Sequence, residues 1–199
     1  MPAWFDEGHQ ESRNVLCRVC LKDEFNTGMG FLLSKSLDWL DSRASWQFLS
    51  IFYVARWVLI VPYMIGAKFL FTDAQISAAG VSKLSDIEPA LLFANIVIIG
   101  PLLETLLECS LPFLLLSHLQ RDKGKPAARP WLFVVISALL MVVFHPMLAA
   151  IVPSFITGVF LAYCYAHFAS RGFGYALLYT TGFHGAINVV GWTMIVLSC

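Results

Sequence analysis

Polar side chains that can carry out chemistry lie inside segments that are otherwise apolar. Glu104 and Glu108 share one such segment, His145 lies in the next, and His184 and Asn188 lie in the last. A charged side chain near the centre of a bilayer costs about 2.5–3.5 kcal/mol on insertion scales, so such residues usually have a partner or a function. Together these groups could deprotonate a water, bind a metal ion or stabilise an oxyanion.

The spacing of these residues favours one cluster. Glu104 and Glu108 are one helical turn apart, as are His184 and Asn188, so each pair shares a helix face. Counted from the cytoplasmic ends of the expected helices at a rise of about 1.5 Å per residue, Glu104, His145 and His184 all lie at a depth of about 18–22 Å. Three polar groups from three helices at one depth predict a shared site.

The alternative is purely structural, with the same groups pairing with one another and with Arg56 to hold the helices together. An arginine this deep in a membrane helix needs a carboxylate or several carbonyls. Glu104 and Glu108 are the carboxylates within the expected spans. We therefore expect Arg56 to face the interior of the bundle and to approach Glu108.

Apolar helices that cross a bilayer must position these residues. The chain has 199 residues, of which 58% are hydrophobic and 13% are charged, about half the charged fraction of a soluble domain. Its apolar runs are long and continuous, whereas a transmembrane barrel needs short alternating strands. The predicted fold is all-α, a polytopic transmembrane helical bundle. Its spans, about five in number, are expected at about residues 46–71, 89–119, 131–151, 153–170 and 173–198.

The first 45 residues form the long polar stretch of the chain. We expect residues 1–45 to be a cytoplasmic or interfacial segment ahead of a helical domain at residues 46–199. A short amphipathic helix on the membrane surface is expected in this segment, with apolar residues at helical spacing at Met29, Leu33, Leu37 and Leu40. Cys17 and Cys20 form a lone CxxC, which suits zinc or a redox pair, although two reduced thiols are the simpler interpretation.

Basic residues predict how the chain is oriented. They gather before the first span, between the second and third, and between the fourth and fifth. With five crossings these three segments lie on one side, so the positive-inside rule predicts a multi-pass integral membrane protein with a cytoplasmic N-terminus and Cys199 opposite. The expected partners are membrane lipids and a membrane-associated protein or peptide. The net charge of zero gives no reason to expect nucleic acid.

Three short motifs occur in order within about residues 90–195. They are Pro101-Leu-Leu-Glu104, the lone His145, and His184-Gly-Ala-Ile-Asn188. Together they resemble the CAAX protease and bacteriocin-processing (CPBP) family of intramembrane proteases, whose motifs are EExxxR, FxxxH and HxxxN. The chain departs from this pattern at Thr105, Cys109 and Met141, where the family has its second Glu, its Arg and its Phe.

The resemblance implies a role for each matched residue. Glu104 and His145 would activate the attacking water, and His184 and Asn188 would stabilise the tetrahedral intermediate. The family has been described both as metalloproteases and as glutamate-dependent proteases, so Glu104, His145 and His184 could instead bind a divalent metal such as zinc. Independently of the family, we expect Glu108, one turn from Glu104, to stand in for the missing carboxylate.

Three hypotheses about function remain open. The first is an intramembrane endopeptidase that cleaves a membrane-associated protein or peptide. The second is a catalytically silent relative that acts as a scaffold, an immunity factor or a subunit of a complex, which Thr105 and Cys109 favour. The third is a haem or metal protein with His145 and His184 as axial ligands.

Overall fold

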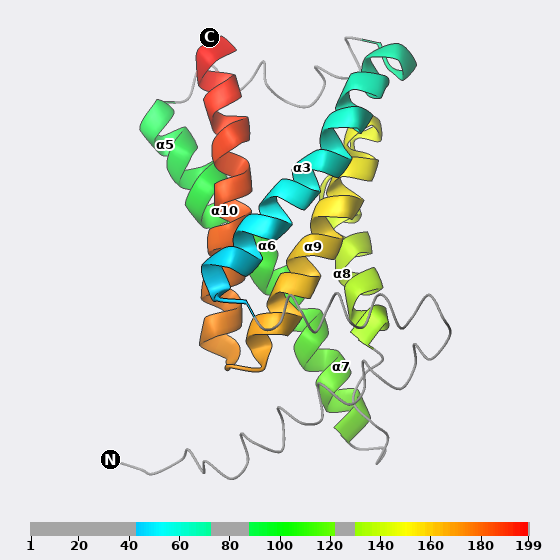
Figure 1. Ribbon diagram of the computed structural model, residues 1–199, viewed down its shortest axis with the longest axis vertical. Coiled ribbons are helices and arrows are strands. Elements are labelled where there is room, and N and C mark those ends of the chain that lie inside the picture. The colour runs from blue at the N-terminus through cyan, green and yellow to red at the C-terminus, as the bar shows by residue number, and fades with distance from the viewer. Residues whose placement is uncertain (1–42, 73–87, 122–129, 199) are drawn as a thin grey trace.

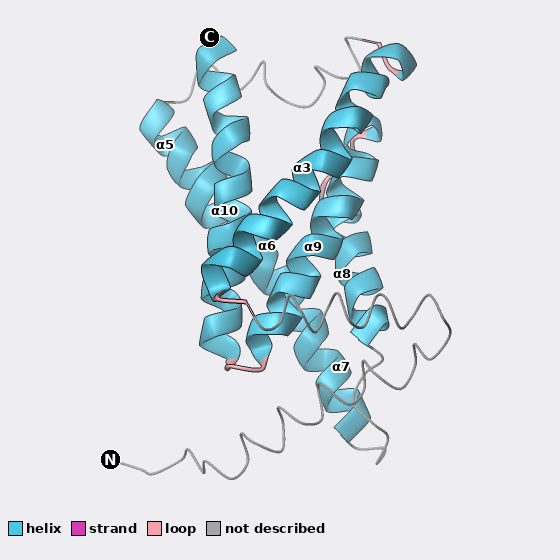
Figure 2. Ribbon diagram, in the orientation of Figure 1, coloured by secondary structure: helices cyan, strands magenta, loops and turns pink. Residues whose placement is uncertain are grey.

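The computed structural model describes residues 43–72, 88–121 and 130–198, and every regular element among them is a helix (Figure 2). The elements are α3 (Ser45–Leu70), α5 (Pro89–Phe93), the π-helix η2 (Ala94–Ile99), α6 (Gly100–Glu104), the π-helix η3 (Thr105–Ser110), α7 (Leu111–Arg121), α8 (Pro130–Phe144), the 3-10 turn η4 (Leu148–Ala150), α9 (Ile151–Ala169) and α10 (Phe173–Ser198). The all-α prediction is confirmed. The expected amphipathic helix, the CxxC and Cys199 lie outside the described residues.

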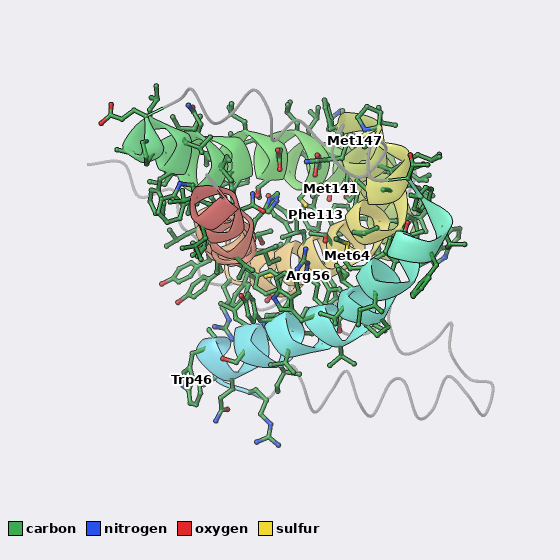
Figure 3. The ribbon with its side chains drawn as sticks, turned by 90° about the horizontal axis from the view of Figure 1, so that it is seen from above. Trp46, Arg56, Met64, Phe113, Met141 and Met147 are labelled. Carbon is green, nitrogen blue, oxygen red and sulfur yellow. The ribbon has the colours of Figure 1, made fainter. Side chains whose placement is uncertain are left out.

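These elements make an integral membrane bundle. Three helical stretches are long and apolar enough to cross a bilayer, namely Ser45–Ala67, Pro89–His118 and Leu148–Ala169. α8 is apolar but shorter, and α10 forms a further long helix beside the start of the second stretch (Figure 1). Seen from above, the helices surround a shared interior (Figure 3).

The third expected span is shorter than predicted, and its predicted end was wrong. Residues 131–151 were expected to be one helix with His145 inside it, but α8 ends at Phe144 and His145 lies in the bend after it. Pro146 explains the ending, because a residue before proline is driven away from the α conformation. The 15 residues of α8 rise only about 22 Å. His145 therefore lies just beyond the end of a short helix and not within a full span.

Two π-helical segments interrupt the rod from α5 to α7. A carbonyl in a π-helix is paired with the N–H five residues later, as in the bond from the Gly100 N–H to the Asn95 carbonyl. The next carbonyl, that of Ile96, would need an N–H from Pro101, which has none. The Ile96 carbonyl in η2 therefore lacks a backbone N–H partner, and it lies in the element just before α6, which carries Glu104.

Hydrogen bonds join the ends of the helices on two sides of the bundle. Arg171, in the α9–α10 turn, donates from Nη1 to Ser45 Oγ at 2.8 Å, and Trp192 Nε1 of α10 donates to the Pro89 carbonyl at 3.3 Å. Gly172, with φ +121°, closes the α9–α10 turn in a conformation that glycine adopts readily. The start of α3 and the α9–α10 turn thus share one side of the bundle (Figure 1), as the alternating topology requires.

Candidate active site

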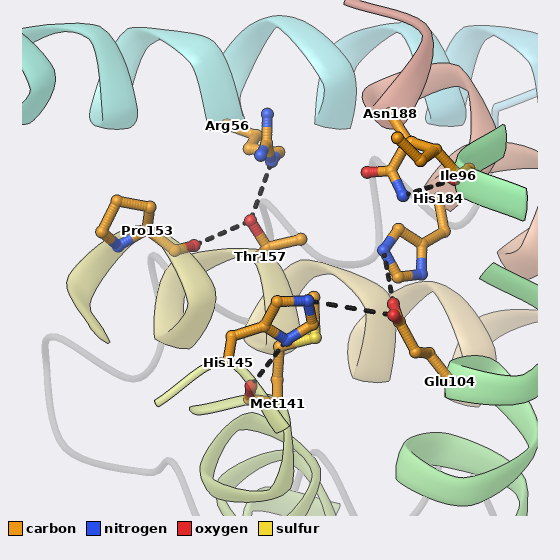
Figure 4. Close-up of polar contacts among 9 residues, drawn as sticks. All are labelled: Arg56, Ile96, Glu104, Met141, His145, Pro153, Thr157, His184 and Asn188. Carbon is orange, nitrogen blue, oxygen red and sulfur yellow. Dashed lines mark hydrogen bonds and ion pairs between the residues drawn. The ribbon is translucent and has the colours of Figure 1, made fainter. Parts of the chain in front are cut away.

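The carboxylate of Glu104 lies between two histidines that come from other helices. Glu104 ends α6, and its Oε2 is 3.3 Å from Nε2 of His184 on α10. Its Oε1 is 3.8 Å from Nε2 of His145, which lies directly after α8 (Figure 4). The three residues expected at one depth therefore come together in the structure.

The backbone fixes the orientation of the His145 ring. Its Nδ1 is 3.0 Å from the Met141 carbonyl oxygen. A carbonyl only accepts, so Nδ1 carries the hydrogen in this contact, and a neutral ring then presents a lone pair at Nε2. That lone pair points toward Glu104, which is the arrangement required of a general base or a ligand.

Burial divides the site into a closed and an open part. The side chain of His184 is 2% exposed, whereas that of Glu104 is 28% exposed and that of His145 is 37% exposed. His184 Nδ1 and Glu104 Oε2 are buried without a hydrogen-bond partner in the part of the chain that the structure describes. Glu104 and His145 are thus accessible to a small molecule, and His184 forms the buried wall behind the carboxylate.

Asn188 lies one turn from His184 and contacts the irregular helix opposite. Its Nδ2 donates to the Ile96 carbonyl at 3.0 Å. This is the carbonyl that Pro101 leaves unpaired, so the side chain satisfies the backbone of η2 and ties α10 to the rod that carries Glu104.

Arg56 meets only half of its prediction. It is buried, with 8% of its surface exposed, and faces the interior (Figure 3). Its Nε donates to Thr157 Oγ1 of α9 at 3.0 Å, and no ion pair joins it to Glu108 in the described part of the chain. The predicted approach to Glu108 was wrong, because a hydroxyl on the neighbouring helix α9 is its partner instead. Glu108 is 1% exposed, and its Oε1 has no hydrogen-bond partner among the described residues.

The residues that depart from the family motifs are packed in the core. Thr105 and Cys109 in η3 are each 1% exposed, and Met141 is 4% exposed. The positions of the second Glu and the Arg of the EExxxR motif are therefore filled here by small or neutral side chains without access to solvent.

The described residues do not fit a resident metal ion in this arrangement. No group of three or more His, Cys, Asp or Glu side chains among residues 43–72, 88–121 and 130–198 is placed to hold one. Nor do the two imidazoles face one another as axial ligands of a haem would, since both Nε2 atoms face the same carboxylate. The chemistry below therefore uses the side chains alone.

Comparison with known proteins decides the family. Residues 86–190 match the family model described as type II CAAX prenyl endopeptidase Rce1-like. The chain belongs to this family. The CPBP resemblance is thereby confirmed, and the protein is a CAAX-protease-like integral membrane protein. No match was found to a curated protein or to a solved structure. The matched region carries Glu104, His145, His184 and Asn188, whereas Arg56 on α3 lies outside it.

Three groups that support the site were not predicted from the sequence. They are the Met141 carbonyl under His145, the Ile96 carbonyl under Asn188 and the hydroxyl of Thr157 beside Arg56. For the Ile96 carbonyl a signal was present, because a proline five residues later leaves a π-helical carbonyl free. Nothing in the sequence indicated Thr157.

Proposed function

We propose that this protein is an intramembrane endopeptidase that hydrolyses a peptide bond in a membrane-associated protein or peptide. The observation that supports it best is the carboxylate of Glu104 held between two imidazoles from separate helices. A carboxylate and an imidazole that are partly exposed and close to each other are groups that can assist the hydrolysis of an amide by water.

The distance between Glu104 and His145 suits a shared water. At 3.8 Å, Oε1 and Nε2 are too far apart for a direct hydrogen bond. A water about 2.8 Å from each atom would form an angle of about 85° between them. In the proposed reaction, Glu104 takes a proton from this water, His145 accepts a hydrogen bond from it, and the resulting hydroxide attacks the peptide carbonyl. Glu104 then returns the proton to the leaving amine.

The family description suggests the class of substrate. It names a CAAX prenyl endopeptidase, and CAAX denotes a C-terminal motif whose cysteine carries a prenyl chain. We therefore propose a prenylated CAAX peptide as the substrate. A prenyl chain would partition into the bilayer and bring its peptide to a site that lies among membrane helices.

A catalytically silent relative is the second candidate, favoured by the neutral, buried Thr105 and Cys109. The two hypotheses separate in proteoliposomes that contain the purified full chain and farnesylated CAAX peptides. An endopeptidase releases the C-terminal fragment, and Glu104→Gln and His145→Ala each lower the rate by at least about 10²-fold, as expected for loss of a general base. Glu88→Gln, an exposed acid ahead of α5, is the matched control. A folded wild-type chain that cleaves none of the peptides supports the silent relative.

A further inference from the structure

Arg56 is a buried cation without an anionic partner among the described residues. Its exposed fraction is 8%, and its Nη1 is buried with no hydrogen-bond partner within residues 43–72, 88–121 and 130–198. Its contacts are the hydroxyl of Thr157 and the ring of Trp57, whose centroid is 4.7 Å from Cζ. A guanidinium always carries its charge, so it cannot escape the cost of burial by losing a proton. Such a charge requires compensation from an anion or from several polar groups.

Thr157 holds the guanidinium in one orientation. Its hydroxyl donates to the Pro153 carbonyl at 2.7 Å, so only its lone pairs remain for the Nε–H of Arg56 at 3.0 Å. With Nε engaged, the buried Nη1 remains for another acceptor. Holding one edge of the fork in place prepares the rest of it to bind an anion.

The side chain is directed toward the candidate active site. Arg56 extends from α3 toward α9, on the side where the three site residues lie (Figure 4). It is farther than 4.0 Å from the carboxylates of Glu104 and Glu108, since neither forms an ion pair with it in the described ranges.

We propose that Arg56 binds an anionic oxygen of the peptide substrate, which makes α3 part of the substrate site. This proposal depends on the peptidase function proposed above. Two oxygens of the same chemistry qualify, namely the free C-terminal carboxylate of the peptide and the oxyanion of the tetrahedral intermediate. The second is relevant because the Asn188 amide, expected to bind the oxyanion, donates to the Ile96 carbonyl here.

Binding of a defined peptide tests the inference without relying on turnover. The probe is an N-dansylated, S-farnesylated CAAX peptide, prepared as the free acid and as the C-terminal amide. A third form, also an amide, carries a phosphinate in place of the scissile bond. Affinities are measured by fluorescence with the full-length Glu104→Gln protein in nanodiscs, which prevents cleavage. Each affinity measurement is repeated after Arg56→Gln, Arg56→Lys or the control Arg171→Gln is added to this protein. The exposed guanidinium of Arg171 lies in the α9–α10 turn.

If Arg56 binds the C-terminal carboxylate, the free acid binds about 10–100-fold more tightly than the amide, as a charge-assisted hydrogen bond provides. Arg56→Gln removes this preference, and Arg56→Lys keeps part of it. If the oxyanion is the ligand, Arg56→Gln lowers the affinity for the phosphinate peptide by a similar factor, and the free acid and the amide bind with equal affinity. The inference is overturned if folded Arg56→Gln binds all three peptides as the parent protein does.

Folding and function can fail separately in this design. If Arg56→Gln does not fold, Thr157→Val provides the test, because it keeps the charge but removes the hydroxyl that orients it. The inference is overturned if Thr157→Val binds each of the three peptides with the same affinity as the parent protein. Charge-dependent peptide binding without any cleavage by the wild type would refute the peptidase proposal alone. If neither Arg56→Gln nor Arg56→Lys changes cleavage or peptide binding, the proposed role of Arg56 is refuted and the peptidase proposal is not.

Discussion

Replacing Gly185 by alanine should push helix α10, which carries His184 and Asn188, away from η2. Gly185 comes directly after His184 on α10 and packs against η2. A Cβ added there would lie 2.5 Å from the Val97 carbonyl oxygen, whereas ordinary contacts begin at 3.4 Å. Helix α10 and η2 must therefore move apart by about 0.9 Å, and the obstacle is backbone rather than a flexible side chain. We expect Gly185→Ala to destabilise the protein by about 1–3 kcal/mol, the usual cost of overpacking.

The same movement should impair catalysis. It lengthens the bond from Asn188 to the Ile96 carbonyl, now 3.0 Å, and displaces His184 relative to Glu104. A misplacement of about 1 Å at a reacting centre lowers rates by about 10²-fold. The assay is thermal unfolding in detergent, monitored by tryptophan fluorescence, together with cleavage of a farnesylated CAAX peptide. Gly182→Ala is the matched control, because on the same helix its Cβ would meet nothing within 4 Å. Equal unfolding temperatures and rates for the two variants would refute the reasoning.

Three further predictions concern other contacts of the bundle. Gly158→Ala should lower the unfolding temperature, because its Cβ would lie 2.7 Å from a backbone atom of α8, whereas Gly174→Ala, with open space, should not. Asn188→Ala should destabilise the fold by about 1 kcal/mol even if the protein is silent, because it removes the hydrogen bond to the partly buried Ile96 carbonyl; an unfolding temperature equal to wild type would contradict this. Maleimide labelling from each side should modify Cys17 and Cys199 from opposite faces, and labelling from one face would exclude an odd number of crossings.

Much of the fold was predictable because apolar length is a direct signal. Four of the five expected spans begin and end within about two residues of helical stretches in the structure, and the third ends early, at Phe144. The convergence of Glu104, His145 and His184 was predictable for a related reason, since helical rise converts sequence position into depth. Depth reports nothing about rotation around a helix axis, however. This is why Arg56 could be assigned to the interior but was given the wrong partner.

The irregular backbone was beyond the reach of periodicity. Pro101 and Pro112 lie within the second span, yet the chain there stays helical and adopts π segments before each proline. A π segment adds a residue to a turn and shifts the register of the helix beyond it. Whether the chain bends or changes register depends on which neighbour satisfies the released carbonyls. In this protein the neighbour is Asn188, 92 residues away in the sequence.

The degenerate first motif is understandable once burial is known. Thr105 and Cys109 fill core positions in η3, and in the described part of the chain Thr105 Oγ1 forms no hydrogen bond. A Glu and an Arg at these positions would bring two opposite charges into the core together. Removing only one of them would leave the other charge buried and uncompensated. Replacing both by neutral side chains avoids that cost and leaves Glu104 between its two histidines. If the site needs a cation, it must come from another helix, and in the described part of the chain Arg56 is the buried guanidinium with a nitrogen still free to provide it.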